Sequence, residues 1–192
     1  MTIHLYWHTE PPAALEALAG RWRAVTGDQV VIWHPDVLVG LHRLIAQSAG
    51  AVDERDRRRH GANVARWFLL SRLGGLWADT DVTPLRALPA DWADDPWSAG
   101  LGRTPTPFIC GGPAGPPWDR ALAESLGQPH GPSPQASGGS ALARVCRRGD
   151  LLVRPAGLFA ATDAAGRPLP EPPAGRYCGH EWATSSQRSR SA

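Results

Sequence analysis

The sequence predicts an α/β fold whose sheet contains parallel strands flanked by helices. The first reason is its opening pattern of strand (3–7), helix (12–25) and strand (30–33), because parallel strands need a crossover connection that is usually a helix. The second is the segment 60–84, which predicts a helix, a glycine pair, a short buried strand and then two aspartates. The third is size: 192 residues with 42% hydrophobic and 20% charged side chains suit one globular domain with a proper core.

The N-terminal elements are read from apolar patterning. Residues 3–7 alternate and end in aromatic side chains, and a Glu-Pro-Pro sequence then ends the strand. The helix at 12–25 places apolar residues on one face. Residues 30–33 are a short apolar run between turn residues and a His-Pro pair, as expected for a buried strand. A second helix is predicted at 37–46.

The run 53–59, DERDRRR, leaves two interpretations open. A solvated loop or helix start is favoured over a phosphate-binding patch. The next helix is predicted at 63–73, because apolar side chains recur along one side of it. Gly74-Gly75 ends this helix, since glycine adopts the left-handed conformation that a helix end requires. Residues 76–78 then form the strand that leads to the aspartates.

Beyond residue 84 the patterns are weaker. The domain is predicted to span 1–184, followed by a mobile tail at 185–192 that lacks apolar residues. The remaining predicted elements are strands at 97–101, 108–110 and 151–153, helices at 118–126 and 140–147, turns at 111–113 and 115–117, a loop at 127–139 and a stiff connector at 168–173.

Composition narrows the class of protein and its compartment. A net charge of +2 gives no argument for nucleic-acid binding. The three cysteines are far apart and form no CxxC pair, which argues against a zinc site and favours buried thiols in a reducing cytoplasm. No apolar run approaches the roughly 20 residues of a membrane span, so no integral membrane segment is expected. The N-terminal residues lack the pattern of a signal peptide.

Asp79 and Asp81 are the strongest candidates for chemistry. They follow directly on a predicted strand, and ligands in α/β sheets bind at the carboxyl ends of strands. Carboxylate oxygens are suitable ligands for Mg²⁺ or Mn²⁺, and such a cation would bind a diphosphate. Two like charges so close repel each other, and a bound cation would relieve the repulsion. The alternative is a pair of solubilising acids on an exposed loop.

The same region resembles a known family. Residues 62–67 (ANVARW) and 74–82 (GGLWADTDV) resemble the block SDxxRY…GGxYxDxDV of the sugar-binding-DXD glycosyltransferases. That group includes the family 32 capsular-polysaccharide and mannosyl transferases and, more distantly, the clostridial glucosylating toxins. Shorter segments at 3–7 (IHLYW), 137–140 (SGGS) and 178–182 (CGHEW) are similar to the family's IHxxW, TGP and HHW segments.

The resemblance implies a GT-A fold, with a Rossmann-like mixed sheet and a nucleotide-sugar site at the strand ends. It also implies a metal-dependent, retaining transferase of polysaccharide-biosynthesis type. Such an enzyme would use Mn²⁺ or Mg²⁺ and a donor linked to a nucleoside diphosphate, UDP or GDP. The acceptor, whether a glycan, a protein or a small molecule, is not indicated.

By position, the resemblance implies a role for each matching residue. Asp79 would contact the ribose, or the metal through water, Asp81 would bind the metal directly, and His180 would approach the metal or the diphosphate. Arg66 would reach the sugar or the phosphates with its planar fork of donors, and is grouped with the two aspartates as catalytic. These four residues are therefore expected to converge on one cleft. The implied substrate contacts are Trp7, on which the base would stack, Asn63, Arg66, Trp77, Thr80 and Ser185.

The chain departs from the family pattern at several of these positions. Asn63 stands where the family has aspartate, so it brings no negative charge and cannot act as a base. Trp67 and Trp77 replace tyrosines, and Ser185-Ser186 replaces a Ser-Trp pair. A non-catalytic relative that binds nucleotide sugars or partners is therefore the alternative. A nucleotidyl or phosphoryl transferase is a third possibility, but the chain lacks a phosphate loop such as GxxxxGK[ST].

Overall fold

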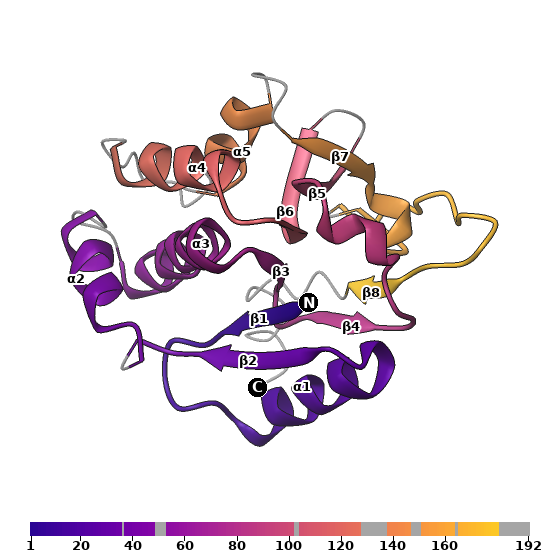
Figure 1. The fold of residues 1–192 in the computed structure, drawn as a ribbon, viewed down its shortest axis with the longest axis horizontal. Coiled ribbons are helices and arrows are strands. Elements are labelled where there is room, and N and C mark those ends of the chain that lie inside the picture. Colours follow the sequence, from indigo (N-terminus) through magenta and orange to yellow (C-terminus); the bar gives the residue numbers. More distant parts are fainter. Residues whose placement is uncertain are drawn as a thin grey trace.

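The computed structural model describes residues 1–35, 37–48, 53–101, 104–127, 138–146, 151–163 and 165–180. Six strands form the main sheet, in the order β2-β1-β3-β6-β5-β7 (Figure 1). They are β1 (Thr2–Tyr6), β2 (Gln29–Trp33), β3 (Gly75–Ala78), β5 (Trp97–Leu101), β6 (Thr104–Gly112) and β7 (Leu152–Pro155). β1 pairs in parallel with β2 and β3, and β5 pairs in parallel with β7. β6 runs antiparallel to both of its neighbours, so the sheet is mixed but mostly parallel.

Helices cover both faces of this sheet (Figure 1). On one face, α1 (Ala13–Thr26) packs Leu15, Ala19 and Trp22 against Ile3 and Leu5 of β1. On the other face, the buried core joins Tyr6 of β1 to four helices. These helices are α2 (Val39–Ser48), α3 (Glu54–Leu73), α4 (Pro116–Gly127) and α5 (Gly139–Cys146). The alternation of side chains along β1 thus separates two cores, called here the α1-side core and the α3-side core.

A second, smaller sheet lies beside the main one. It consists of β4 (Val82–Pro84) and β8 (Cys178–His180), which pair antiparallel. Two short 3₁₀ turns, Ala90–Ala93 and Ala156–Leu158, lie in the connections that follow β4 and β7. The small sheet brings the segment near the C-terminus against the turn that carries the aspartates. Strands of three residues give no period-2 pattern, which is why the sequence did not predict them.

The predicted α/β fold is confirmed, and most of the predicted elements lie where they were expected. The largest shift is in α3, which begins at Glu54 rather than residue 63. Asp53 caps this helix by accepting a hydrogen bond from the backbone N–H of Asp56 (2.8 Å), and Arg57 and Arg58 both pair with Glu54. The charge run 53–59 is therefore a helix start in which Arg57, Arg58 and Arg59 pair with acids of their own helix, which is the favoured interpretation.

Two predicted turns are wrong. At 115–117, Pro116 and Pro117 already belong to α4. Residues 111–113 were expected to form a turn, but Gly111 and Gly112 continue β6 and pair with Leu76 and Gly75 of β3. The backbones approach so closely that a Cβ on Gly111 would lie 2.6 Å from the carbonyl oxygen of Gly75. The glycines therefore serve close strand packing here, and a glycine pair in sequence does not distinguish this from a turn.

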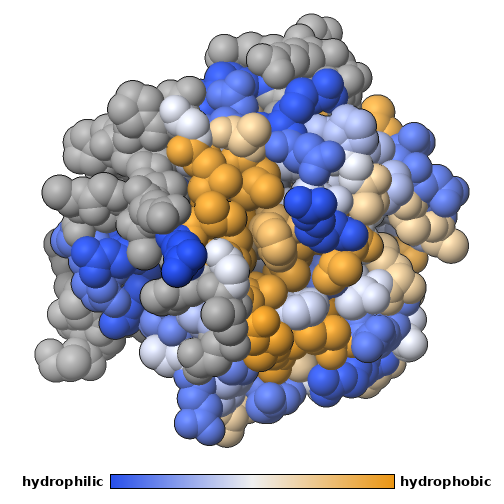
Figure 2. All heavy atoms as spheres, turned by 60° about the vertical axis from the view of Figure 1, so that its left-hand side comes forward, coloured by the Kyte–Doolittle hydropathy of each residue, from blue (hydrophilic) through white to orange (hydrophobic). Residues whose placement is uncertain are grey.

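The loop predicted at 127–139 lies mostly outside the described residues, and the tail at 185–192 lies entirely outside them. Cys110 and Cys178 are buried and free, as expected. None of the described helices combines the length and hydrophobicity that a membrane span requires. Hydrophobic surface is visible on the side of the molecule where α2 lies (Figure 2), and Val37 and Leu44 are among the exposed large apolar residues.

Candidate functional site

The turn between β3 and β4 carries both aspartates. Asp79 follows β3, and its backbone N–H donates to the carbonyl oxygen of Phe108 on β6 (2.8 Å). The N–H of Val82 donates back to the carbonyl oxygen of Asp79 (3.0 Å), which closes a tight turn over residues 79–82. Thr80 lies half-buried in this turn. The turn fixes the two carboxylates at the carboxyl end of β3, the edge at which α/β sheets bind ligands.

Arg66 reaches this turn from α3 and holds Asp79. Its Nη2 lies 2.6 Å from Oδ1 of Asp79, and the indole N–H of Trp77 donates to the same oxygen at 2.7 Å. Arg66 is 4% exposed, whereas the Asp79 side chain is 34% exposed. The pair is therefore buried on the helix side and open to solvent on the other. An arginine so buried stabilises a structure only when its charge is compensated, as it is here.

Asn63 extends this pair by one residue. Its side-chain oxygen accepts a hydrogen bond from Nη1 of Arg66 (3.0 Å), one helical turn along α3. The guanidinium thus donates to Asn63 with one nitrogen and to Asp79 with the other, and it lies 5.0 Å from the centre of the Trp77 ring. We call Asn63, Arg66, Asp79 and Trp77 the α3 relay.

The electrostatics of Asp79 reflect this position. Burial raises the pKa of its carboxyl above the ordinary range, the Arg66 guanidinium opposes that effect, and the neighbouring Asp81 adds to it. The hydrogen bond from Trp77 and the nearby His180 both favour the ionised form. A divalent cation beside the carboxylates would offset both the cost of burying the charge of Asp79 and its repulsion from Asp81.

His180 meets Asp81 on the other side of the turn. Because β8 pairs with β4, His180 lies opposite Val82, and its Nε2 is 3.1 Å from Oδ1 of Asp81. Its ring stacks on Phe108, with centres 4.2 Å apart and planes 10° apart. Sequence reasoning missed Phe108, because its contact with His180 depends on the β6 register and not on any local motif. We call Asp81, His180 and Phe108 the β8 clasp.

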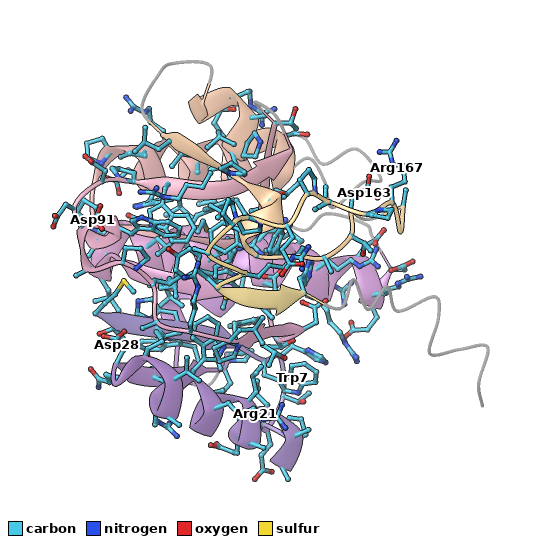
Figure 3. All side chains as sticks on the ribbon, turned by 90° about the vertical axis from the view of Figure 1, so that its right-hand side faces the viewer. Trp7, Arg21, Asp28, Asp91, Asp163 and Arg167 are labelled. Carbon is cyan, nitrogen blue, oxygen red and sulfur yellow. The ribbon has the colours of Figure 1, made fainter. Side chains whose placement is uncertain are left out.

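Trp7 lies at the same edge of the sheet. It follows β1 directly, is half-buried against the α1-side core, and donates its backbone N–H to the carbonyl oxygen of Trp33 (2.9 Å). Figure 3 places it far from Asp28, which pairs with the N-terminal amine beside the start of β1. Trp7 therefore occupies the carboxyl end of β1, as predicted. That it faces a bound base stays a prediction.

The structure places one other predicted substrate contact differently from the expectation. Trp77 was expected to offer a stacking face, but it is 2% exposed and lies against Tyr6, with ring centres 6.4 Å apart. The strand period directs it into the α3-side core, so it acts on Asp79 through its N–H instead. Ser185 lies outside the described residues.

Asp79, Asp81 and His180 are the predicted metal ligands at this turn. No group of three or more His, Cys, Asp or Glu among the described residues is arranged to hold an ion, so Asp79, Asp81 and His180 do not form a complete protein cage. Mg²⁺ and similar hard cations are commonly bound by one or two carboxylates together with substrate phosphates and water. The two carboxylates at this turn fit that mode, in which the substrate completes the coordination.

The fold resembles those of solved glycosyltransferases. The PaToxG glycosyltransferase aligns with 77% of this chain and 68% of its own, with a TM-score of 0.57 and 11% identity. A glycosyltransferase involved in glycosylation of the major capsid of PBCV-1 aligns with 98% of this chain and 97% of its own, with a TM-score of 0.55 and 11% identity. At such identities the likeness establishes the fold. No protein-family model matches the sequence, and no curated protein matches it.

Proposed function

We propose that this chain is a glycosyltransferase that binds a nucleoside-diphosphate sugar with Mn²⁺ or Mg²⁺ and transfers the sugar to an acceptor with retention of configuration. The observation that carries the proposal is the convergence of the α3 relay and the β8 clasp on one four-residue turn. His180 lies 99 positions from Asp81 in the sequence, and an unrelated fold has no reason to bring it to the turn that Arg66 also reaches. The likeness to the two glycosyltransferases adds support.

Each residue then has a defined task in binding. Asp81, with Asp79 behind it, would hold the cation, and His180 would orient the Asp81 carboxylate. When bound, the cation supplies positive charge that stabilises the leaving diphosphate. Arg66, fixed by two hydrogen bonds, keeps a permanent positive charge beside the same place. Trp7 would stack on the nucleotide base, and Thr80 and Ser185 would complete the contacts to the donor.

The acceptor step follows from the same arrangement. The bond between the sugar and the diphosphate breaks, a bond to the acceptor oxygen forms, and the leaving phosphate takes the acceptor proton. Arg66 and the carboxylates orient the diphosphate and are not consumed. The donor class, UDP or GDP, and a cytoplasmic setting are part of the proposal, on the basis of the family resemblance and of the buried thiols.

The proposal is tested with the purified chain and a panel of UDP-, GDP- and TDP-sugars. We expect a rise in the unfolding temperature with one donor, dependent on Mn²⁺, and slow release of its nucleoside diphosphate. Without an acceptor, hydrolysis replaces transfer and needs no knowledge of the natural partner. Failure of every donor to shift the unfolding temperature, with or without Mn²⁺, would refute nucleotide-sugar binding.

A second candidate is a non-catalytic protein that binds the same ligands. Asn63 favours it, because the neutral amide leaves the Arg66 charge to be balanced by Asp79. This candidate predicts binding of a donor with Mn²⁺ but neither hydrolysis nor transfer to any acceptor. The replacement Asn63→Asp would test whether the missing charge is responsible, since it should then raise hydrolysis without altering the fold.

A further inference from the structure

Gly138, the residue directly before α5, lies against Asn63 of the α3 relay. Gly138 is buried, and its carbonyl oxygen accepts the hydrogen bond of Leu142 (3.1 Å) that begins the helix. On its other side it faces Asn63. A Cβ placed on Gly138 would lie 2.8 Å from Nδ2, 2.9 Å from Oδ1 and 3.0 Å from Cγ of Asn63. The whole amide group of Asn63 is therefore seated against this glycine.

The requirement for glycine here is one of space. Gly138 does not have a positive φ, so its backbone conformation is open to any residue. A methyl group at distances of 3.0 Å or less would push the Asn63 amide aside. That amide in turn holds Nη1 of Arg66 at 3.0 Å, and Arg66 holds Asp79 at 2.6 Å. A displacement at Gly138 would thus be transmitted to the carboxylate through two hydrogen bonds.

We propose that Gly138 is a positioning residue for the donor site: it seats Asn63 so that Asn63 fixes the Arg66 guanidinium against Asp79. The inference rests on the proposed function for its ligand, but the geometry behind it does not. It makes the start of α5 part of the binding apparatus, although it is far from the aspartates in sequence. It also gives Asn63 a task that an amide performs well, since an uncharged acceptor orients Arg66 without competing with Asp79 for its charge.

The test is a double-mutant cycle on the whole chain, with Gly138→Ala, Asn63→Ala and the pair. Gly138→Ala should lower the unfolding temperature by about 2–4 °C and weaken binding of the responsive donor in Mn²⁺ by about tenfold. In the Asn63→Ala chain, the added Gly138→Ala should change both quantities by less than half as much, because the group it displaces is gone. If Gly138 had a purely structural role, Gly138→Ala would have the same effect in the parent chain and in the Asn63→Ala chain.

A matched control is available on α1. Gly20 is exposed in a helix, and a Cβ there would meet nothing within 4 Å. Gly20→Ala makes the same chemical change and should leave donor binding unaltered and the unfolding temperature equal or slightly higher. Unfolding temperatures report the coupling even when no donor binds, so failure of the proposed function and failure of this inference are separate results. Additive effects of Gly138→Ala and Asn63→Ala on unfolding would overturn the inference.

Discussion

The α3 relay and the β8 clasp lie on either side of the same turn, but they are held in different ways. Arg66 is 4% exposed, carries a permanent charge, and is tied by hydrogen bonds to both Asn63 and Asp79. His180 is also buried, but its bond to Asp81 is longer, at 3.1 Å, and its strand β8 is three residues long. The relay lies beside the α3-side core, whereas the clasp joins His180 of the small sheet to Phe108 of β6, which packs in the α1-side core.

The two clusters therefore have different roles: the α3 relay supports the site, and the β8 clasp carries the carboxylate that binds the ligand. A carboxylate held by a buried arginine and an indole N–H is oriented in advance and cannot move far, so Asp79 is suited to shape the site. A carboxylate that meets an imidazole through one oxygen, as Asp81 does, can bind a cation while the imidazole keeps it oriented. Asp81 is therefore the better candidate for direct contact with an ion, and the predictions below address this division.

The largest effect is expected from removing one charge from the clasp. Asp81→Asn should weaken Mn²⁺-dependent donor binding by about 100-fold or more, with the unfolding temperature nearly unchanged, since the amide oxygen still accepts from His180. Isothermal titration with the responsive donor and Mn²⁺ measures the first quantity, and thermal unfolding the second. Asp94→Asn, a change at an exposed acid elsewhere, is the control. Full Mn²⁺-dependent binding by a folded Asp81→Asn chain would contradict the metal assignment.

A variant of the α3 relay should show the opposite pattern, with its main effect on the stability of the fold. Arg66→Ala leaves Asp79 without its buried partner and should lower the free energy of unfolding by about 2–4 kcal/mol, slightly less than for a fully buried pair because Asp79 is partly exposed. Arg66→Lys keeps the positive charge and should recover part of this loss. The recovery is incomplete because a single ammonium group replaces the guanidinium fork that reaches both Asn63 and Asp79. Urea unfolding at neutral pH measures both variants. Equal stability of Arg66→Ala and the parent chain would show that the relay contributes no support.

The sequence predicted more of the relay than of the clasp. Arg66, Asp79 and Trp77 lie within one helix–strand unit that local patterning predicted, and the resemblance to the family implied that Arg66 lies beside the aspartates. The bond between His180 and Asp81 depends on pairing of two three-residue strands separated by almost a hundred positions, and no local pattern encodes that. The resemblance to a family supplied the expectation for His180. The sequence predicted a buried strand at this position, but the resemblance implied a stacking face for Trp77, which a ring packed in the α3-side core does not offer.

Trp7 tests how far the site extends beyond the turn. If the base stacks on its ring, Trp7→Ala should weaken nucleotide binding by about 1–3 kcal/mol, with similar losses with and without Mn²⁺. Trp7→Phe should keep most of the affinity, because a flat aromatic face remains. The binding of the free nucleoside diphosphate, followed by titration, is the measurement. A loss that appears only in Mn²⁺ would place Trp7 with the ion and not with the base.

The smallest effect is expected at His4, which links the C-terminal end of α3 to the sheet. His4 is fully buried on β1; the indole N–H of Trp33 donates to its Nδ1 (3.0 Å), and its Nε2 lies 2.8 Å from the carbonyl oxygen of Gly74. Because the indole can only donate, Nδ1 must accept, so Nε2 carries the proton and donates to Gly74. A second proton on Nδ1 would face the Trp33 N–H, and the ring is neutral in the fold.

Burial lowers the pKa of His4 below its ordinary value, while the bond to Gly74 partly opposes this shift. As the pH falls through about 6.5, His4 therefore binds a proton in the unfolded chain but stays neutral in the folded chain. The stabilising contribution of neutral His4 is complete above that pH and is lost as the pH falls below it. Between pH 7.5 and 5.5 the free energy of unfolding should fall by about 1 kcal/mol more in the parent than in His4→Gln. His8 also has a lowered pKa but is less buried, so His8→Gln is the matched control and should flatten the profile less. If the two variants and the parent share one pH profile, then His4 is not the group that couples this end of α3 to pH.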